Sequence, residues 1–210
     1  MPDSGPVGGS TAGSTDPRFG YPVTLDLHDV SVLVVGGGRI GARKASGLAA
    51  AGARVRLVAA EVSEHVEPSD VADVRARPFD EGDLDGVRLV VTATGDHDVD
   101  ATVAAAARAR GIWVNAADQP DDCDFILPAV ARRGRVTFAV STDGASPALA
   151  GALRDVVDEL FTDDLAAGAD TLAAARADVH RQGSSTEDVD WSARVGEIIA
   201  ASVRPRNLPG

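Results

Sequence analysis

A run of four apolar residues followed by three spaced glycines constrains the fold of this chain more than any other stretch. Residues 32–35 are Val, Leu, Val and Val, a pattern typical of a parallel strand buried on both faces. Gly36, Gly38 and Gly41 follow with the spacing G-x-G-x-x-G, and an alanine-rich segment comes next. In this spacing the first glycine permits a tight turn, the second lets a pyrophosphate approach, and the third lets helix and strand pack closely. A ligand-free glycine loop is the alternative, but the position between strand and helix favours a nucleotide-binding turn.

The apolar periodicity of the remaining chain predicts an α/β fold. The fold class is a Rossmann-type parallel sheet, followed by a β-hairpin dimerisation segment and a C-terminal helical region. Strands are expected at 21–27 (a short edge strand), 32–35, 54–58, 74–79, 87–94 and 112–115, and hairpin strands at 125–131 and 135–141. Helices are expected at 42–51, 98–110, 148–160, 164–181 and 189–203.

The same patterns divide the chain into four segments. Residues 1–18 are rich in Gly, Ser, Thr, Pro and Asp and predict a disordered leader. The others are a dinucleotide-binding Rossmann domain (19–118), which the resemblance described below makes NAD-binding, a dimerisation hairpin segment (119–147) and a helical region (148–210). The last two are too small for a separate catalytic domain and suit dimerisation.

Composition excludes several classes of function and partner. The net charge of −12 argues against nucleic acid and against an anionic membrane, since both require a basic surface. No apolar run is long enough to span a bilayer, and the N-terminus lacks a signal-peptide pattern, so the cytoplasm is the expected compartment. Cys123 is the single cysteine, and the histidines are scattered, so no resident metal site is expected.

The ends of two predicted strands supply further candidate site residues. Thr92 and Thr94 end the fourth strand, at the edge where an open parallel sheet binds its ligand. Asp118 comes just after the fifth strand, where a carboxylate could accept a proton while a hydride leaves a substrate. Taken alone, Asp118 fits a turn-forming residue before Pro120 better. Lys44 is the only lysine and lies near the glycine turn; it is either a phosphate-side cation or a solvated helix residue.

Five motifs in one order resemble those of the precorrin-2 dehydrogenase/sirohydrochlorin ferrochelatase family, the dehydrogenase module of siroheme synthase. They are Val-Gly-Gly-Gly-x-x-x-x-Arg-Lys at 35–44, Thr-Ala-Thr-Gly-Asp at 92–96, Val-Asn-Ala-Ala-Asp at 114–118, Phe-Ile-Leu-Pro-Ala at 125–129 and Ser-Thr-Asp-Gly-Ala-Ser-Pro at 141–147. The resemblance covers about residues 21–160.

The resemblance implies NAD+-dependent oxidation of precorrin-2 to sirohydrochlorin, and in many members insertion of Fe2+ as a second substrate, in a homodimer. It places the catalytic aspartate of the family at Asp118. It also places NAD contacts at Arg39-Ile40 and at Ala60-Glu61.

Two alternatives to this assignment stay open. One is a dehydrogenase that leaves metal insertion to another protein, and the other is a non-catalytic NAD-sensing module. The acid that binds ribose in such folds usually ends the second strand. At the predicted strand end stands Arg56, with Glu61 expected in a loop. The tetrapyrrole carries eight carboxylates, for which Arg132, Arg133 and Arg135 are candidate partners, although a solvated turn explains each of them more simply.

Overall fold

The computed structural model describes residues 17–204, which divide into two compact units. The first unit ends at Ile126 and the second begins at Leu127. Nearly all of the predicted leader, 1–18, lies outside the described residues.

A five-stranded sheet forms the centre of the first unit. Its strands pair in the order β3-β2-β1-β4-β5, and every pairing is parallel. The strands are β1 (Ser31–Gly37), β2 (Arg54–Val62), β3 (Asp73–Ala76), β4 (Leu89–Thr92) and β5 (Trp113–Ala116). The strand order reverses between β1 and β4, so the carboxyl ends of these two strands flank the crevice where such sheets bind ligands. The predicted Rossmann-type fold is confirmed.

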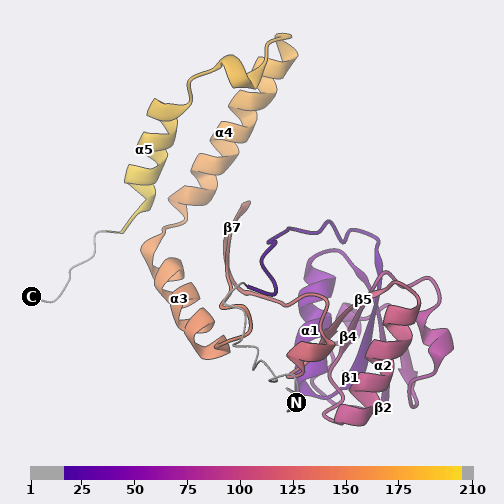
Figure 1. Cartoon of the computed structure of the whole chain (residues 1–210). Helices are drawn as coiled ribbons and strands as arrows, with labels where there is room; N and C mark the ends of the chain where they lie inside the picture. Colours follow the sequence, from indigo (N-terminus) through magenta and orange to yellow (C-terminus); the bar gives the residue numbers. More distant parts are fainter. Residues whose placement is uncertain (1–16, 205–210) are drawn as a thin grey trace, which may run out of the picture. The chain divides into compact units, whose positions relative to one another are not determined.

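Two helices cover opposite faces of this sheet, α1 (Arg39–Ala50) and α2 (His97–Ala109) (Figure 1). Val34 and its neighbours on one face form a buried cluster with Ala45 and Leu48 of α1. Leu33 on the other face belongs to a second cluster that includes residues of α2. Because β1 is covered on both sides, its sequence is apolar throughout rather than alternating.

One predicted strand is absent from the structure. Residues 21–27 form no strand, and most of their apolar side chains are open to solvent, with Tyr21 87% and Val23 58% exposed, whereas Leu27 is half-buried against the cluster that contains Val34. The alternation of apolar residues in this segment therefore does not reflect burial of one strand face. Strand β2 is longer than the predicted strand at 54–58. It continues to Val62, because Gly37 pairs with Val62 across a register shift after Val35.

Arg18 is anchored although it belongs to the predicted leader. Its guanidinium donates hydrogen bonds to the backbone oxygens of Pro120 (2.8 Å), Asp121 (3.2 Å) and Cys123 (3.0 Å). The segment before the sheet is thus tied to the loop that follows the last strand.

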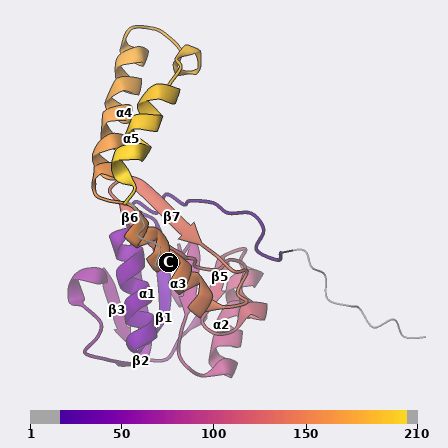
Figure 2. The same cartoon turned by 90° about the vertical axis from the view of Figure 1, so that its left-hand side faces the viewer.

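The second unit contains the predicted hairpin and three helices. Strands β6 (Ala129–Arg133) and β7 (Val136–Val140) pair antiparallel. The helices are α3 (Pro147–Leu160), α4 (Asp164–Arg181) and α5 (Ser192–Ser202), and α4 and α5 run side by side (Figure 1, Figure 2). Ser146 caps α3 by accepting the N–H of Leu149, and Pro147 stands at the first helical position.

Candidate functional site

The glycine turn joins β1 to α1 at the carboxyl edge of the sheet. Gly36 has a φ of 115°, and a Cβ there would overlap the backbone oxygen of Ala93. A Cβ on Gly41 would overlap the backbone oxygen of Gly36. A Cβ on Gly38 would instead meet nothing within 4 Å. Gly36 and Gly41 are therefore required by packing, whereas Gly38 borders open space, as a glycine does where a ligand approaches the backbone.

The first turn of α1 has the properties of an anion site. Gly38 is the N-cap and provides no side-chain cap, and no acidic residue lies in the first turn. The first N–H groups of the helix and its positive dipole end thus point toward the open space beside Gly38. Arg39 and Ile40, the next two residues, are exposed there.

Glu61 lies at the carboxyl end of β2 and not in a loop. A Cβ on Gly37 would overlap the backbone oxygen of Glu61, so the end of β2 lies against the glycine turn. Ala60 and Glu61 are both exposed. Arg56, in contrast, is near the start of β2, where its guanidinium donates to Asp73 at 3.1 Å and to the backbone oxygen of Asp83 at 3.0 Å. The prediction of Arg56 at the end of the second strand and Glu61 in a loop was wrong. The acid Glu61 stands at the end of β2, the usual position of a ribose-binding acid.

Thr92 and Thr94 both bind the carboxylate of Asp100 on α2. Thr92 is fully buried, and its hydroxyl donates to Asp100 Oδ1. The hydroxyl of Thr94 donates to the same oxygen at 2.8 Å, and the backbone N–H of Thr94 does so at 3.2 Å. The Thr92 hydroxyl is thus engaged inside the protein, and only Thr94, which is half-buried, borders the surface at this edge.

Asp118 is exposed, between half-buried Ala117 and Gln119, and occupies the left-handed region of the backbone map, with a φ of 61°. The turn is closed by the N–H of Gln119, which donates to the backbone oxygen of Ala116 at 3.3 Å. Within residues 17–204, the Asp118 carboxylate accepts no hydrogen bond. Asp118 is therefore a turn residue, as its sequence position suggests, but its carboxylate does not make the Asx hydrogen bond and remains available for chemistry.

Lys44 lies in the electrostatic field of Asp118. Burial lowers the pKa of the Lys44 ammonium, the charge of Arg43 lowers it further, and Cys123 and Asp118 oppose the shift. The lone lysine is thus half-buried on α1 and influenced by the carboxylate after β5, rather than fully solvated.

Cys123 supports the loop that carries Asp118. Its buried thiol lies 3.2 Å from both the N–H and the carbonyl oxygen of Ala116, and 3.4 Å from the carbonyl oxygen of Gln119. Burial raises the pKa of the thiol, with a smaller contribution from Asp124. Burial is therefore the main cause of the shift, and the protonated thiol supports the turn.

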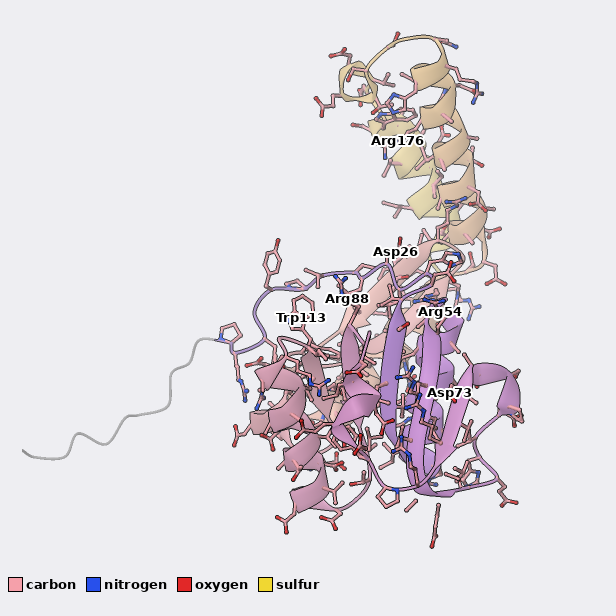
Figure 3. All side chains as sticks on the ribbon, turned by 90° about the vertical axis from the view of Figure 1, so that its right-hand side faces the viewer. Asp26, Arg54, Asp73, Arg88, Trp113 and Arg176 are labelled. Carbon is pink, nitrogen blue, oxygen red and sulfur yellow. The ribbon has the colours of Figure 1, made fainter. Side chains whose placement is uncertain are left out.

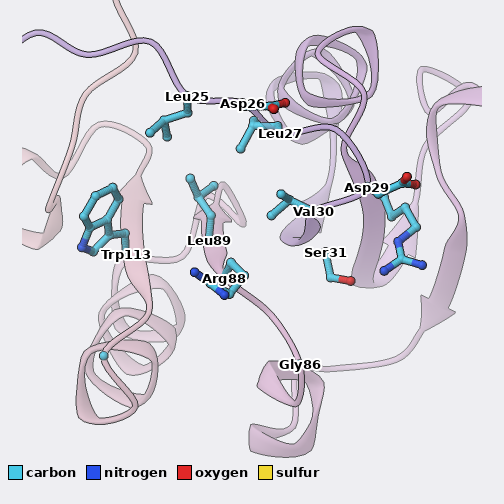
Figure 4. Close-up of a pocket in the computed structure, with 12 residues that line it drawn as sticks. Leu25, Asp26, Leu27, Asp29, Val30, Ser31, Gly86, Arg88, Leu89 and Trp113 are labelled. Carbon is cyan, nitrogen blue, oxygen red and sulfur yellow. The ribbon is translucent and has the colours of Figure 1, made fainter.

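A pocket of about 680 Å³ opens at the opposite, amino edge of the sheet. Its lining includes the start of β4 and Trp113 at the start of β5 (Figure 4). Arg54, Arg88 and Trp113 mark this edge in Figure 3. Because parallel α/β sheets bind ligands at their carboxyl ends, we place the site at the glycine turn and not in this pocket.

The hairpin arginines differ in how they are used. Arg133 donates to the Asp158 carboxylate at 2.6 Å and to its backbone oxygen at 2.7 Å. Arg135 pairs with Asp170 at 2.7 Å, and both side chains are largely exposed. Arg132 is exposed and forms no ion pair with the described residues. Of the three candidates, Arg133 is the one firmly held by its own chain.

Two searches of the described residues bear on metals and membranes. Residues 17–204 contain no cluster of three or more His, Cys, Asp or Glu side chains that could hold a metal ion. In the same range, no helix has the length and apolar character needed to cross a bilayer.

Comparisons with known proteins agree with the geometry at the glycine turn. A family model described as "Putative NAD(P)-binding" matches residues 23–129. The siroheme synthase of Methylococcus capsulatus is 46% identical over 140 residues, covering 65% of this chain and 30% of that protein. Siroheme synthase 1 of Halorhodospira halophila is 39% identical over 186 residues, covering 85% of this chain and 37% of that protein. The chain thus spans about a third of the length of these curated relatives.

A solved structure shares most of the fold. It is named SirC, precorrin-2 dehydrogenase, and matches with a TM-score of 0.62 at 30% identity. The match covers 86% of this chain and 88% of that one, so it extends beyond the Rossmann unit.

Proposed function

This chain belongs to the precorrin-2 dehydrogenase family, and from that membership we propose that it oxidises precorrin-2 to sirohydrochlorin with NAD+. The observation that carries the proposal is the Asp118 carboxylate, which accepts no hydrogen bond from residues 17–204 and lies at the same sheet edge as the open glycine turn. A dehydrogenation site needs a dinucleotide and a proton acceptor close together, and this edge supplies a candidate for each.

The glycine turn fits a dinucleotide. We propose that the N–H groups after Gly38 bind its pyrophosphate and that Glu61 binds a ribose hydroxyl. Arg39, Ile40 and Ala60 flank the same space as proposed contacts. A ribose-binding acid at the end of β2 favours NAD over NADP, because a carboxylate repels the 2′-phosphate. When bound, NAD+ supplies the acceptor for the substrate hydride.

Asp118 is the proposed general base. Oxidation of precorrin-2 removes two hydrogens, one as a hydride and one as a proton. The proton passes to the Asp118 carboxylate, which accepts no hydrogen bond from residues 17–204 that would compete. Asp118 is exposed, so its carboxylate can return the proton to solvent.

The same carboxylate suits the insertion of Fe2+ into sirohydrochlorin. Metal insertion releases the pyrrole N–H protons, so it also needs a base at the face of the macrocycle. The similarity to siroheme synthases supports this second step as part of the proposal. A chain that performs only the dehydrogenation would retain the same aspartate.

We also propose that the chain acts as a homodimer. Three apolar residues of α3, namely Leu149, Leu153 and Val156, are 40–52% exposed and recur with the i, i+4, i+7 spacing of one helix face. An exposed apolar stripe of this kind is typical of a helix that packs against a partner. The second copy of this chain is the proposed partner.

One experiment separates the candidate functions. Purified protein is incubated with precorrin-2 and NAD+ under anaerobic conditions while NADH is followed by absorbance, and Fe2+ is then added. The proposal expects stoichiometric NADH followed by the siroheme spectrum. NADH without siroheme would identify a dehydrogenase that leaves iron to another protein. Binding of NAD+ without turnover would overturn the enzymatic proposal and favour an NAD-sensing module.

A further inference from the structure

A buried carboxylate on α2 connects the two loops of the proposed site. Asp100 is 2% exposed. Its Oδ1 accepts three hydrogen bonds from the end of β4: from the Thr92 hydroxyl, the Thr94 hydroxyl and the Thr94 N–H. Its Oδ2 accepts one hydrogen bond, from the side-chain amide of Gln119 at 3.2 Å. Both oxygens of this residue are therefore used, each by a different loop.

The Gln119 bond acts next to the proposed base. Gln119 follows Asp118 directly, and its backbone N–H closes the turn on Ala116 at 3.3 Å. The backbone bond fixes the curvature of the turn, and the side-chain bond to Asp100 fixes its rotation relative to the sheet. Aspartate tolerates the left-handed region better than most residues but does not require it, so hydrogen bonds around Asp118 are needed to keep the turn in one orientation.

We propose that Asp100 is the positioning residue of the site, and that the Asp100–Gln119 hydrogen bond orients the Asp118 turn toward the substrate. This inference rests on the proposed function for its kinetic consequence but not for its structural one. A carboxylate suits this position because it only accepts, and all four of its partners are donors. The buried charge is thus satisfied by hydrogen bonds that come from both loops.

The polarity of the pair provides a sharp test. Gln119→Glu replaces the donor with a second acceptor, so at pH 8 the introduced carboxylate is repelled by Asp100 and the turn loses its attachment. Asp100→Asn in the same chain restores a complementary pair. The carbonyl oxygen of the introduced asparagine can accept from the threonines while its NH2 group donates to the introduced glutamate. The change at Asp100 alone is isosteric, so the buried cavity keeps its volume.

Kinetics report the orientation of the turn. For Gln119→Glu we expect kcat for NADH formation to fall by about 10–10²-fold, because a misplaced catalytic group has effects of this size. The dissociation constant for NAD+ should stay within a factor of about two, since no hydrogen bond at the glycine turn is altered. The double variant should recover kcat to within a few-fold of the wild type. Gln182→Glu, the same chemical change at the exposed C-cap of α4, serves as the matched control.

A second measurement does not depend on activity. Hydrogen–deuterium exchange of peptides that cover 115–124 should be faster in Gln119→Glu and return to the wild-type rate in the double variant. An unchanged kcat in Gln119→Glu would overturn the proposal, as would a double variant that folds but does not recover. If the wild type forms no NADH, the proposed function fails, while the exchange comparison still decides whether Asp100 holds the turn.

Discussion

A Cβ on Gly41 would overlap the backbone oxygen of Gly36, so the start of α1 is pressed against the end of β1. This contact is possible only because Gly41 has no side chain, and it fixes the direction in which the helix N-terminus points. Gly38, between them, has no such neighbour. The three glycines therefore serve two purposes. Gly36 and Gly41 allow the close packing of strand and helix, and Gly38 leaves space for a ligand.

The first prediction separates these purposes. Gly38→Asp should leave the fold intact, because a Cβ there meets no protein atom within 4 Å. It should weaken NAD+ binding by at least about tenfold, or about 1.4 kcal/mol, because a carboxylate would stand where the pyrophosphate approaches. Gly47→Asp, at an exposed position of α1 with equally open surroundings, is the matched control. Equal NAD+ affinities of the two variants in calorimetric titration would count against the nucleotide assignment.

The second prediction concerns the acid at the end of β2. Glu61→Gln should reduce the preference for NAD+ over NADP+ by about tenfold, because the repulsion of the 2′-phosphate is removed. Glu64→Gln, a nearby exposed acid beyond the strand, should not change this ratio. Parallel titrations with both dinucleotides provide the measurement. If Glu61→Gln keeps the wild-type preference for NAD+ over NADP+, another group must distinguish the two dinucleotides at the ribose.

The third prediction tests the proposed base. Asp118→Asn should lower the rate of NADH formation by about 10²–10⁴-fold, the usual effect of removing a general base. Asparagine tolerates the left-handed backbone, so the turn should keep its shape. Iron insertion is assayed separately, with sirohydrochlorin supplied directly, and should fall in parallel. Near-normal rates in both assays would leave Asp118 as a turn residue only.

The fourth prediction addresses the dimer. Leu153→Glu places a charge in the middle of the exposed apolar face of α3 and should shift the protein to monomers in sedimentation velocity. Ala148→Glu adds the same charge in the first turn of the helix, where an acid is favourable, and should leave the association unchanged. A Leu153→Glu protein that sediments like the wild type would place the interface elsewhere.

The fifth prediction concerns acid stability. Burial alone would raise the pKa of Asp83, but hydrogen bonds from Arg77, the Asp80 N–H and Arg75 outweigh it and lower that pKa to about 2. A folded-state pKa below the unfolded value stabilises the protein above about pH 4, and this contribution is lost as the pH falls toward about 2.

Substitution at this carboxylate should remove that contribution. Asp83→Asn should lower the free energy of unfolding at about pH 7 by about 2 kcal/mol and flatten its dependence between about pH 4 and about pH 2. Asp85→Asn, at an exposed pair with Arg110, should cost under about 1 kcal/mol. Urea denaturation at several pH values provides the comparison, and an unchanged slope in Asp83→Asn would exclude Asp83 as the source.

The parallel sheet was predictable because local sequence and burial agree there. Residues 32–35 are apolar at every position, and their burial on both faces leaves no other placement. The strand predicted at 21–27 was wrong, because alternation of apolar residues does not by itself show that a neighbouring strand is available for pairing. The extension of β2 to Val62 depends on its pairing with Gly37, which residues 59–62 do not reveal by themselves.

The site was predictable only where the spacing is local. Gly36, Gly38 and Gly41 indicate the turn within a stretch of six residues. The carboxyl end of the strand then indicates which edge of the sheet binds the ligand. The pairing of Asp100 with Gln119 joins residues 19 apart on different elements. Nothing in the composition around Asp100 distinguishes it from the neighbouring acids of α2, so its burial could be known only from the fold.

The anchoring of Arg18 has a consequence for how the chain assembles. Its bonds reach residues 102–105 positions away, so this closure cannot form until the whole sheet has been synthesised. Contacts of such long range are among the slowest to form in folding. The guanidinium is also half-exposed, which makes the closure an easily reopened part of the unit. During synthesis on the ribosome, the loop after β5 therefore binds Arg18 late, once the strands that precede this loop have emerged.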